Sequence, residues 1–347
     1  MIHRSEFLKW VAGACLGLGI LTGCTTTGTP TTSNTTPEQA GAGTGNRPPG
    51  TDPNAKFRIG VSVPAADHGW TAGMVWWAKE AMAMYPNVEW TFTTADNPTK
   101  QIKDLETMMV KGVDAVVILS TESGPITPIA KQIKERGILL VNVDRGFLEP
   151  VADIFVEGDN EAFGRKAAEF IVEKLNGQGN ILVLQGIPGV TVNTIRVDSA
   201  NEVFKRHPGI KVLESQAGNW SREKSLSVMQ AMLLKHKDVD AVWAADDDMA
   251  LGAEQALKEA GRTGDVFIVG GGGMKDIVKR IGENDPLYPA TVTYPPSMIA
   301  YGISQAVITL QAGKDKALGF MPRHLKIDCD LVTPGNAKDY YFENSTY

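Results

Sequence analysis

The sequence predicts an α/β protein made of two similar lobes, each with a doubly wound parallel sheet. From Arg58 onward, apolar runs of strand length alternate with amphipathic stretches of helix length, which is the pattern of βαβ units. The runs are apolar almost throughout, as in parallel strands that are covered on both faces. Ten such runs are too many for one comfortable sheet, so we expect them to be divided between two lobes.

The expected strands and helices follow one another in a regular order. The strand runs lie at 59–63, 88–93, 114–120, 138–144, 153–158, 180–186, 211–218, 240–246, 266–271 and 290–294. Amphipathic stretches lie between them, for example at 99–112, 161–177 and 221–236. In the first of these, Ile102, Leu105, Met108 and Met109 fall on one helical face, which is expected to pack against a sheet.

The first 24 residues form a separate segment. Arg4 and Lys9 precede a short apolar stretch that ends in LTGC at residues 21–24, and this order is typical of an export signal. The ending LTGC resembles the bacterial lipobox, which implies a lipid on Cys24 as the first mature residue. An ordinary signal peptide with a chance cysteine is the alternative. We expect an extracytoplasmic protein that this lipid holds at a bacterial membrane.

The segment at 25–56 is rich in Thr, Gly and Pro and has almost no apolar residues, so we expect a disordered tether. Beyond it, the chain contains one further cysteine, Cys329, so no internal disulfide is expected. The net charge of −6 argues against a nucleic-acid partner, because such proteins usually carry basic patches.

The residues that follow each strand run are the candidate site, because open parallel sheets bind ligands beyond the carboxyl ends of their strands. Asp, Asn and Arg offer planar groups that pair with neighbouring hydroxyls, and aromatic rings pack against the C–H faces of a sugar. The set therefore predicts a site for a neutral monosaccharide or polyol. The candidates are His68, Trp70, Ser120, Glu122, Asp144, Arg145, Asn193, Arg196, Trp220, Asp246 and Tyr294.

Structural roles compete with ligand binding at several aromatic and charged positions. Trp76 and Trp77 lie inside the first expected helix, where core or groove-wall packing is the expected role. Trp70 lies at the mouth of that helix and is expected to face a ligand. Asp144 and Arg145 are expected to contact ligand hydroxyls, and an ion pair that only ties a hinge is the alternative.

Neither a catalytic site nor a bound metal or cofactor is expected. Adjacent carboxylates at a strand-to-helix turn point apart, so Asp246 is a ligand candidate, while Asp247 and Asp248 are expected in the first turn of the next helix. The chain lacks the GxSxG and HExxH motifs of common hydrolases. Arg145 and Arg196 would hold nearby carboxylates ionised, which does not suit a general acid.

Four motifs carry a family resemblance through their order along the chain. They are VDRG at 143–146, QGIPGVTVNTIR at 185–196, GNWSREKSLSVMQAMLLKHKDVDAVWAADDDMALGAEQAL at 218–257 and FIVGGGGMKD at 267–276. They resemble the periplasmic ribose/galactose-type sugar-binding proteins, the type I solute-binding proteins of ABC importers. The similarity covers roughly residues 57 to 330. It implies two lobes joined by a three-segment hinge, near 157–160, 294–296 and 326–329.

The resemblance also implies roles for single residues. Trp70 takes the place of the stacking aromatic after the first strand, and Trp220 that of the aromatic in the second lobe. Asp144 and Arg145 match the Asp–Arg pair of the family, and Arg196 matches its loop arginine.

The chain departs from the ribose-binding pattern at other positions of the site. His68 stands for an Asn, Thr71 for a second Phe and Tyr294 for a Gln, whereas Asp246 falls on the family's strand-end amide position. Gly271 and Gly272 stand for a Phe–Asp pair, which is expected to open space and remove one hydroxyl acceptor. A sugar or polyol other than ribose is therefore expected.

The resemblance implies a monomeric solute-binding lipoprotein that captures a neutral monosaccharide or polyol and delivers it to the membrane subunits of an ABC permease. The N-terminal lobe is expected at 57–158 plus about 295–327, and the C-terminal lobe at about 159–294 plus about 328–347. A receptor that reports its ligand state to a membrane chemosensor or sensor kinase is the alternative. A sugar-responsive transcription regulator is disfavoured by the export signal.

Overall fold

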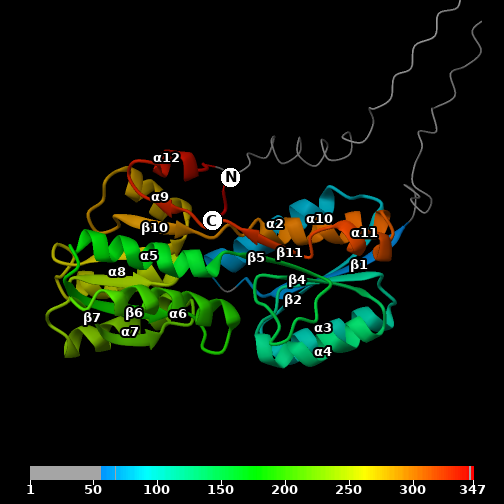
Figure 1. Cartoon of the computed structure of the whole chain (residues 1–347), viewed down its shortest axis with the longest axis horizontal. Coiled ribbons are helices and arrows are strands. Elements are labelled where there is room, and N and C mark those ends of the chain that lie inside the picture. The colour runs from blue at the N-terminus through cyan, green and yellow to red at the C-terminus, as the bar shows by residue number, and fades with distance from the viewer. Residues whose placement is uncertain (1–55, 67, 344) are drawn as a thin grey trace, which may run out of the picture. The chain divides into compact units, whose positions relative to one another are not determined.

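The computed structural model describes residues 56–66, 68–343 and 345–347. The expected signal peptide, the lipidation site Cys24 and nearly all of the expected tether lie outside the described residues. Two six-stranded sheets organise the described part of the chain, each covered by helices (Figure 1). The predicted fold class is thus confirmed, and we name the sheets with their helices the N-terminal and C-terminal lobes.

The sheet of the N-terminal lobe is parallel throughout, in the order β11-β5-β4-β3-β1-β2. Helices α3 and α4 cover one face, and α2 and α10 cover the other (Figure 1). The predicted apolar face of α3 packs into the core between α3, α4 and the sheet. The elements are β1 (Phe57–Pro64), α2 (Gly69–Ala83), β2 (Val88–Ala95), α3 (Pro98–Val110), β3 (Ala115–Ile118), α4 (Ser123–Glu135), β4 (Leu139–Val143), β5 (Ile154–Gly158), α10 (Met298–Gln311), α11 (Lys314–Phe320) and β11 (His324–Ile327).

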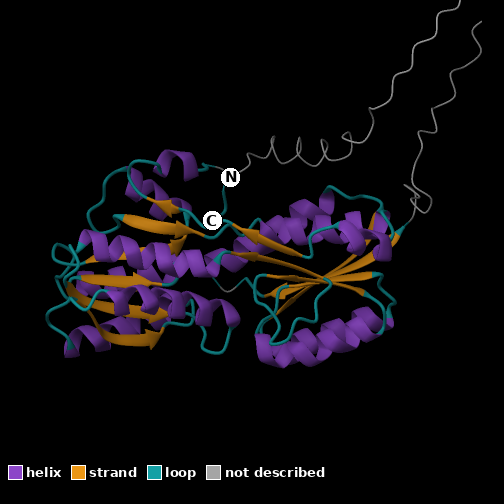
Figure 2. Ribbon diagram, in the orientation of Figure 1, coloured by secondary structure: helices purple, strands orange, loops and turns teal. Residues whose placement is uncertain are grey.

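The sheet of the C-terminal lobe has the order β12-β10-β9-β8-β6-β7, and only the edge strand β12 is antiparallel to its neighbour. Helices also cover this sheet (Figure 2). Among them, α5 packs against α6, and α7 packs against α8. The elements are α5 (Asn160–Lys174), β6 (Gly179–Gln185), α6 (Thr191–Arg206), β7 (Ile210–Ala217), α7 (Arg222–Lys235), β8 (Ala241–Ala244), α8 (Asp247–Glu259), β9 (Phe267–Gly272), α9 (Lys275–Gly282), β10 (Ala290–Thr293), β12 (Leu331–Val332) and α12 (Ala337–Tyr340).

The chain passes between the lobes three times, from β5 to α5, from β10 to α10 and from β11 to β12. Two of these crossings touch each other, because Gly158 at the end of β5 lies against the ring of Tyr294 after β10. A Cβ atom on Gly158 would lie 2.2 Å from Tyr294 Cε2, so a larger residue would displace the ring. Each of the ten expected strands overlaps one of β1 to β10.

Strands β11 and β12 are not predicted from the sequence. They have four and two residues and lie at the edges of the two sheets, where a strand needs no continuous apolar run. Within the described residues, none of the helices combines the length and the apolar character that a membrane span needs.

Candidate ligand-binding site

A pocket lies where strand ends of the two lobes meet. It holds about 320 Å³ of empty space, part of it continuous with the solvent. Except for Val192, Gly271 and Gly272, every residue that lines it is a ligand contact predicted from the sequence. The lining residues are His68, Trp70, Asp144, Arg145, Val192, Arg196, Trp220, Asp246, Gly271, Gly272 and Tyr294.

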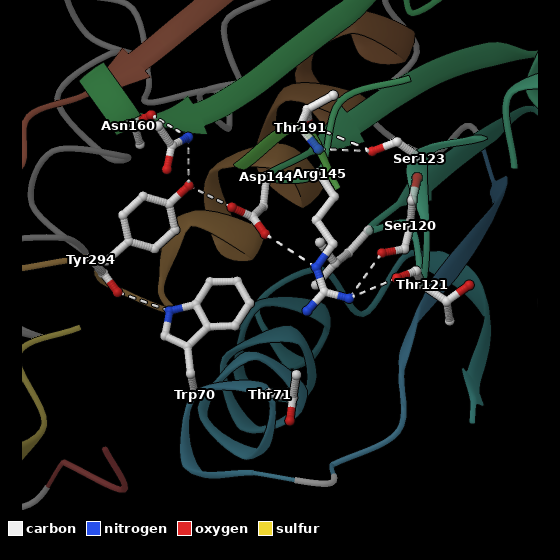
Figure 3. Close-up of polar contacts among 12 residues, drawn as sticks. Trp70, Thr71, Ser120, Thr121, Ser123, Asp144, Arg145, Asn160, Thr191 and Tyr294 are labelled. Carbon is white, nitrogen blue, oxygen red and sulfur yellow. Dashed lines mark hydrogen bonds and ion pairs between the residues drawn. The ribbon is translucent and has the colours of Figure 1, made fainter. Parts of the chain in front are cut away.

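Asp144 and Arg145 follow β4 and are buried together. Asp144 has a φ of 63°, in the left-handed region that non-glycine residues seldom adopt. The Tyr294 hydroxyl donates a hydrogen bond to Oδ1 of Asp144 (Figure 3). Arg145 Nε lies 3.8 Å from Asp144 Oδ2, and its Nη1 donates to the carbonyl oxygens of Ser120 (3.3 Å) and Thr121 (2.9 Å). The local backbone and these contacts fix both side chains at the pocket.

Arg196 on α6 lies between two aromatic rings. Its guanidinium carbon is 3.8 Å from the ring centre of Phe163 and 4.1 Å from that of Tyr294. Nε donates to Oδ1 of Asn160 and Nη1 to the carbonyl oxygen of Ala245, both at 2.9 Å. The Asn160 amide in turn donates to the Tyr294 hydroxyl at 3.1 Å. One hydrogen-bonded network therefore runs from Arg196 through the hinge to the N-terminal lobe.

Trp70 and Trp220 reach the pocket from different lobes. Trp70 Nε1 donates to the carbonyl oxygen of Tyr294 at 2.9 Å, and the two rings lie 5.8 Å apart. Trp220 adopts a φ of 58°, and its ring lies against Gly186, where a Cβ would be 2.3 Å from Cε2. The Arg145 guanidinium lies 4.7 Å from the Trp220 ring centre. Strained backbone of this kind concentrates at functional sites.

The three aspartates at the start of α8 point to different partners. Asp246 caps the helix, because its Oδ1 accepts from the Met249 N–H at 2.9 Å. Asp247 and Asp248 lie in the first turn, as predicted. Asp247 accepts from two backbone N–H groups of the loop after β9. Asp248 crosses to the other lobe, where its Oδ2 accepts from the Gly69 N–H at 2.9 Å.

The glycine pair does not open the space that the sequence analysis expects. A Cβ on Gly271 would lie 2.0 Å from the Phe163 ring, and a Cβ on Gly272 would lie 2.1 Å from the Tyr347 hydroxyl. Two aromatic side chains from other parts of the chain therefore fill the volume beside these glycines. This expectation is wrong because it considers only residues near the strand end.

Ser120, Glu122 and Asn193 do not line the pocket. Ser120 takes part through its carbonyl oxygen, which accepts from Arg145. Glu122 is exposed at the residue before α4. The Asn193 Oδ1 accepts from the Gly186 N–H at 2.7 Å, so this side chain holds the loop before α6.

For the two tryptophans inside α2, the expectation of core packing is met only in part. Trp76 and Trp77 stay out of the pocket, as expected, but both are half-buried. Their rings pack edge to face, with centres 4.8 Å apart. The two rings thus contact each other at half-buried positions of the helix.

The comparison with known families agrees with this geometry. Residues 59–315 match the model of the periplasmic binding protein domain. The chain belongs to the periplasmic binding protein family. The curated relatives are solute-binding proteins and not enzymes, so the expectation of a non-enzyme is confirmed.

Individual relatives of this periplasmic binding protein cover most of its length. The xylitol-binding protein of Mycolicibacterium smegmatis is 31% identical over 288 residues, which are 81% of this chain and 77% of that protein. A solute-binding protein from Bacillus halodurans, solved with myo-inositol, has a TM-score of 0.77 and 26% identity over 86% of this chain and all of its own. The fructose-binding periplasmic domain of a hybrid two-component system has a TM-score of 0.74 and 28% identity, over 82% of this chain and 92% of its own.

The stability of this periplasmic binding protein should decrease as the pH rises through neutrality. Burial raises the pKa of Asp246 from 3.8 to about 7, and burial raises that of Asp247 to about 6. The folded protein then binds these protons more tightly than the unfolded chain. Their contribution to the free energy of unfolding is therefore full below the ordinary pKa and is lost as the pH rises through about 7.

Urea unfolding between about pH 4 and pH 8 measures this effect. The Asp246→Asn variant keeps the helix cap and removes the charge, so its free energy of unfolding should decrease less over this range. Asp198→Asn, at an exposed position of α6, is the matched control and should follow the wild type. An equal change of the free energy of unfolding with pH in wild type and Asp246→Asn would contradict the assignment of this effect to Asp246.

Proposed function

We propose that this protein captures a neutral monosaccharide or polyol in the pocket between its lobes. As a lipoprotein held at the membrane by Cys24, it then delivers this ligand to an ABC permease. The observation that carries the proposal is the make-up of the pocket. Trp70 and Trp220 offer apolar rings from the two lobes, and between them lie planar carboxylate and guanidinium groups. Rings suit the C–H faces of a sugar, and planar groups suit neighbouring hydroxyls.

The charges of the pocket favour a neutral ligand. The carboxyl groups of Asp144 and Asp246 line the pocket together with the guanidinium groups of Arg145 and Arg196, so the pocket offers both hydrogen-bond acceptors and donors to a neutral ligand. Binding of an anionic ligand such as a sugar phosphate would require an excess of cationic groups in the pocket or a helix N-terminus free to bind the anion. The names of the relatives, which mention xylitol, myo-inositol and fructose, agree with an uncharged polyhydroxyl compound.

Isothermal titration calorimetry with pentoses, hexoses, inositols and linear polyols tests the proposal. One class should bind with a favourable enthalpy, because many polar hydrogen bonds form in a closed site. Small-angle scattering of the same samples should show a smaller radius of gyration with the bound compound, as hinge closure requires. The proposal would be overturned if only amino acids, peptides or metal ions gave a heat of binding in the titration.

A receptor for a membrane sensor kinase is the second candidate, favoured by the similarity to the fructose-binding domain of a two-component system. Deletion of the gene distinguishes the import function from the signalling function. Loss of uptake of the radiolabelled ligand supports import. Retained uptake with a lost transcriptional response supports signalling.

Asp248 is expected to stabilise the closed form. Its Oδ1 accepts from Arg222 at 3.1 Å in its own lobe, and its Oδ2 accepts from Gly69 of the other lobe. Opening of the cleft would break this contact, so Asp248→Ala should weaken ligand binding about fivefold without changing the order of preferred sugars. Titration measures both quantities. Asp276→Ala, an exposed first-turn aspartate of α9, is the matched control, and an equal loss in both variants would contradict the role.

A further inference from the structure

Tyr347, the last residue of the sequence, is buried against the wall of the pocket, with 6% of its surface exposed. Its ring lies along the first turns of α2, where a Cβ on Gly69 would be 3.0 Å from Cδ2 and a Cβ on Gly73 would be 3.3 Å from the Tyr347 Cβ. Its hydroxyl lies at Gly272, one of the residues that line the pocket. The two α2 glycines are four residues apart, on one face of the helix, and leave room for the ring.

The segment before Tyr347 is tied to the C-terminal lobe. The Lys275 ammonium donates to the carbonyl oxygens of Ser345 (2.9 Å) and Glu343 (3.3 Å). The Ser345 hydroxyl also donates to the carbonyl oxygen of Tyr347. These contacts position the ring at the junction of α2 and β9.

The Tyr347 hydroxyl is the unusual group here. It is buried and has no hydrogen-bond partner among the described residues. Burial raises its pKa well above the ordinary value, and Asp246, Asp247 and Asp248 raise it further, so the hydroxyl stays protonated and can donate. A buried hydroxyl without a partner is unfavourable, which points to a partner from outside the described residues.

We propose that Tyr347 is a ligand-binding residue, whose hydroxyl donates a hydrogen bond to a ligand oxygen beside Gly272. This inference rests on the proposed function. The glycine at 272 lets the hydroxyl approach the pocket, because any Cβ there would occupy its place. Tyr347 thereby selects for ligands that carry a hydroxyl or ring oxygen at this point.

The test is the variant Tyr347→Phe, which keeps the ring and removes only the hydroxyl. Wild type and variant are titrated with xylitol, myo-inositol, D-fructose and D-ribose. The Kd of the compound that binds the wild type most tightly should increase about tenfold in the variant. The melting temperature of the ligand-free variant should stay the same or increase, because the lost hydroxyl has no partner among the described residues.

Tyr288→Phe is the matched control. The Tyr288 hydroxyl is buried in the C-terminal lobe and donates to the carbonyl oxygen of Ala250 (3.2 Å) and to Glu254 (2.9 Å). Its removal should lower the melting temperature and leave the Kd unchanged, which is the opposite pattern.

Single-deoxy analogues of the bound compound complete the test. For the analogue that lacks the partner of Tyr347, wild type and Tyr347→Phe should bind equally. An unchanged Kd in Tyr347→Phe overturns the inference and leaves the proposed function intact. An equal penalty with every analogue also overturns it, because the hydroxyl then acts indirectly. If none of the pentoses, hexoses, inositols and linear polyols of the calorimetric screen binds the wild type, the proposed function fails and this inference fails with it.

Discussion

Replacing Arg196 with alanine is expected to raise the Kd of the ligand at least a hundredfold and to lower the stability of the protein. Arg196 is buried, and its removal leaves the Asn160 amide oxygen and the Ala245 carbonyl oxygen without their donor. It also leaves a gap between the rings of Phe163 and Tyr294. Loss of a buried, hydrogen-bonded charge costs on the order of 3 kcal/mol, which corresponds to a factor of about a hundred.

Arg196→Lys should restore little of this loss. A lysine ammonium is a point charge and cannot lie flat between two rings while donating in two directions. Arg206→Ala is the matched control on the same helix, since Arg206 is exposed and pairs with Glu202 one turn away. Calorimetric titration and thermal unfolding measure the two effects. Wild-type affinity in Arg196→Lys would show that only the positive charge matters at this position.

The positions of the pocket residues could be predicted because parallel strands end at the same edge of their sheet. Trp70, Asp144, Asp246 and Tyr294 each follow a buried strand, and the structure brings all four to one pocket. The rule gives the position of a backbone, however, and not the direction of its side chain. Asn193 shows the difference, because its amide turns back to hold the loop before α6.

Residues from elsewhere in the chain that pack behind the pocket wall could not be predicted in this way. Phe163 lies inside α5 and looks like an ordinary core residue, yet it stacks on Arg196 and fills the volume beside Gly271. Tyr347 lies far along the chain from any strand run. Only the glycines at 271 and 272 mark these two positions in the sequence, and a missing side chain does not reveal which distant ring replaces it.

Tyr294 has a structural role in addition to the one that the sequence suggests. Its hydroxyl donates to Asp144 and accepts from Asn160, while its ring stacks on Arg196. The side chain therefore connects the hinge to both lobes in addition to lining the pocket. A pattern of strand ends does not distinguish such a connecting residue from one that contacts only the ligand.

Asp144→Asn is expected to raise the Kd about a hundredfold, with the loss confined to one or two ligand hydroxyls. Burial raises the pKa of Asp144, while the charge of Arg145 and the Tyr294 hydroxyl lower it. Donors from a ligand would favour the ionised carboxylate in the same way. Hydrogen bonds to a charged group contribute about 1.5–3 kcal/mol each, and an amide in that place presents one acceptor and one misplaced donor.

The competing view is that Asp144 and Arg145 only tie the hinge. Single-deoxy analogues of the bound sugar separate the two, because a direct contact disappears with the hydroxyl that makes it. If Asp144 contacts the ligand, the Asp144→Asn variant and the wild type should have equal Kd values for one of the deoxy analogues. Tyr294→Phe is the matched variant, since it removes the donor to Asp144 while leaving the carboxylate in place. It should weaken all analogues alike through the hinge, and the same uniform loss in Asp144→Asn would assign the aspartate to hinge closure alone.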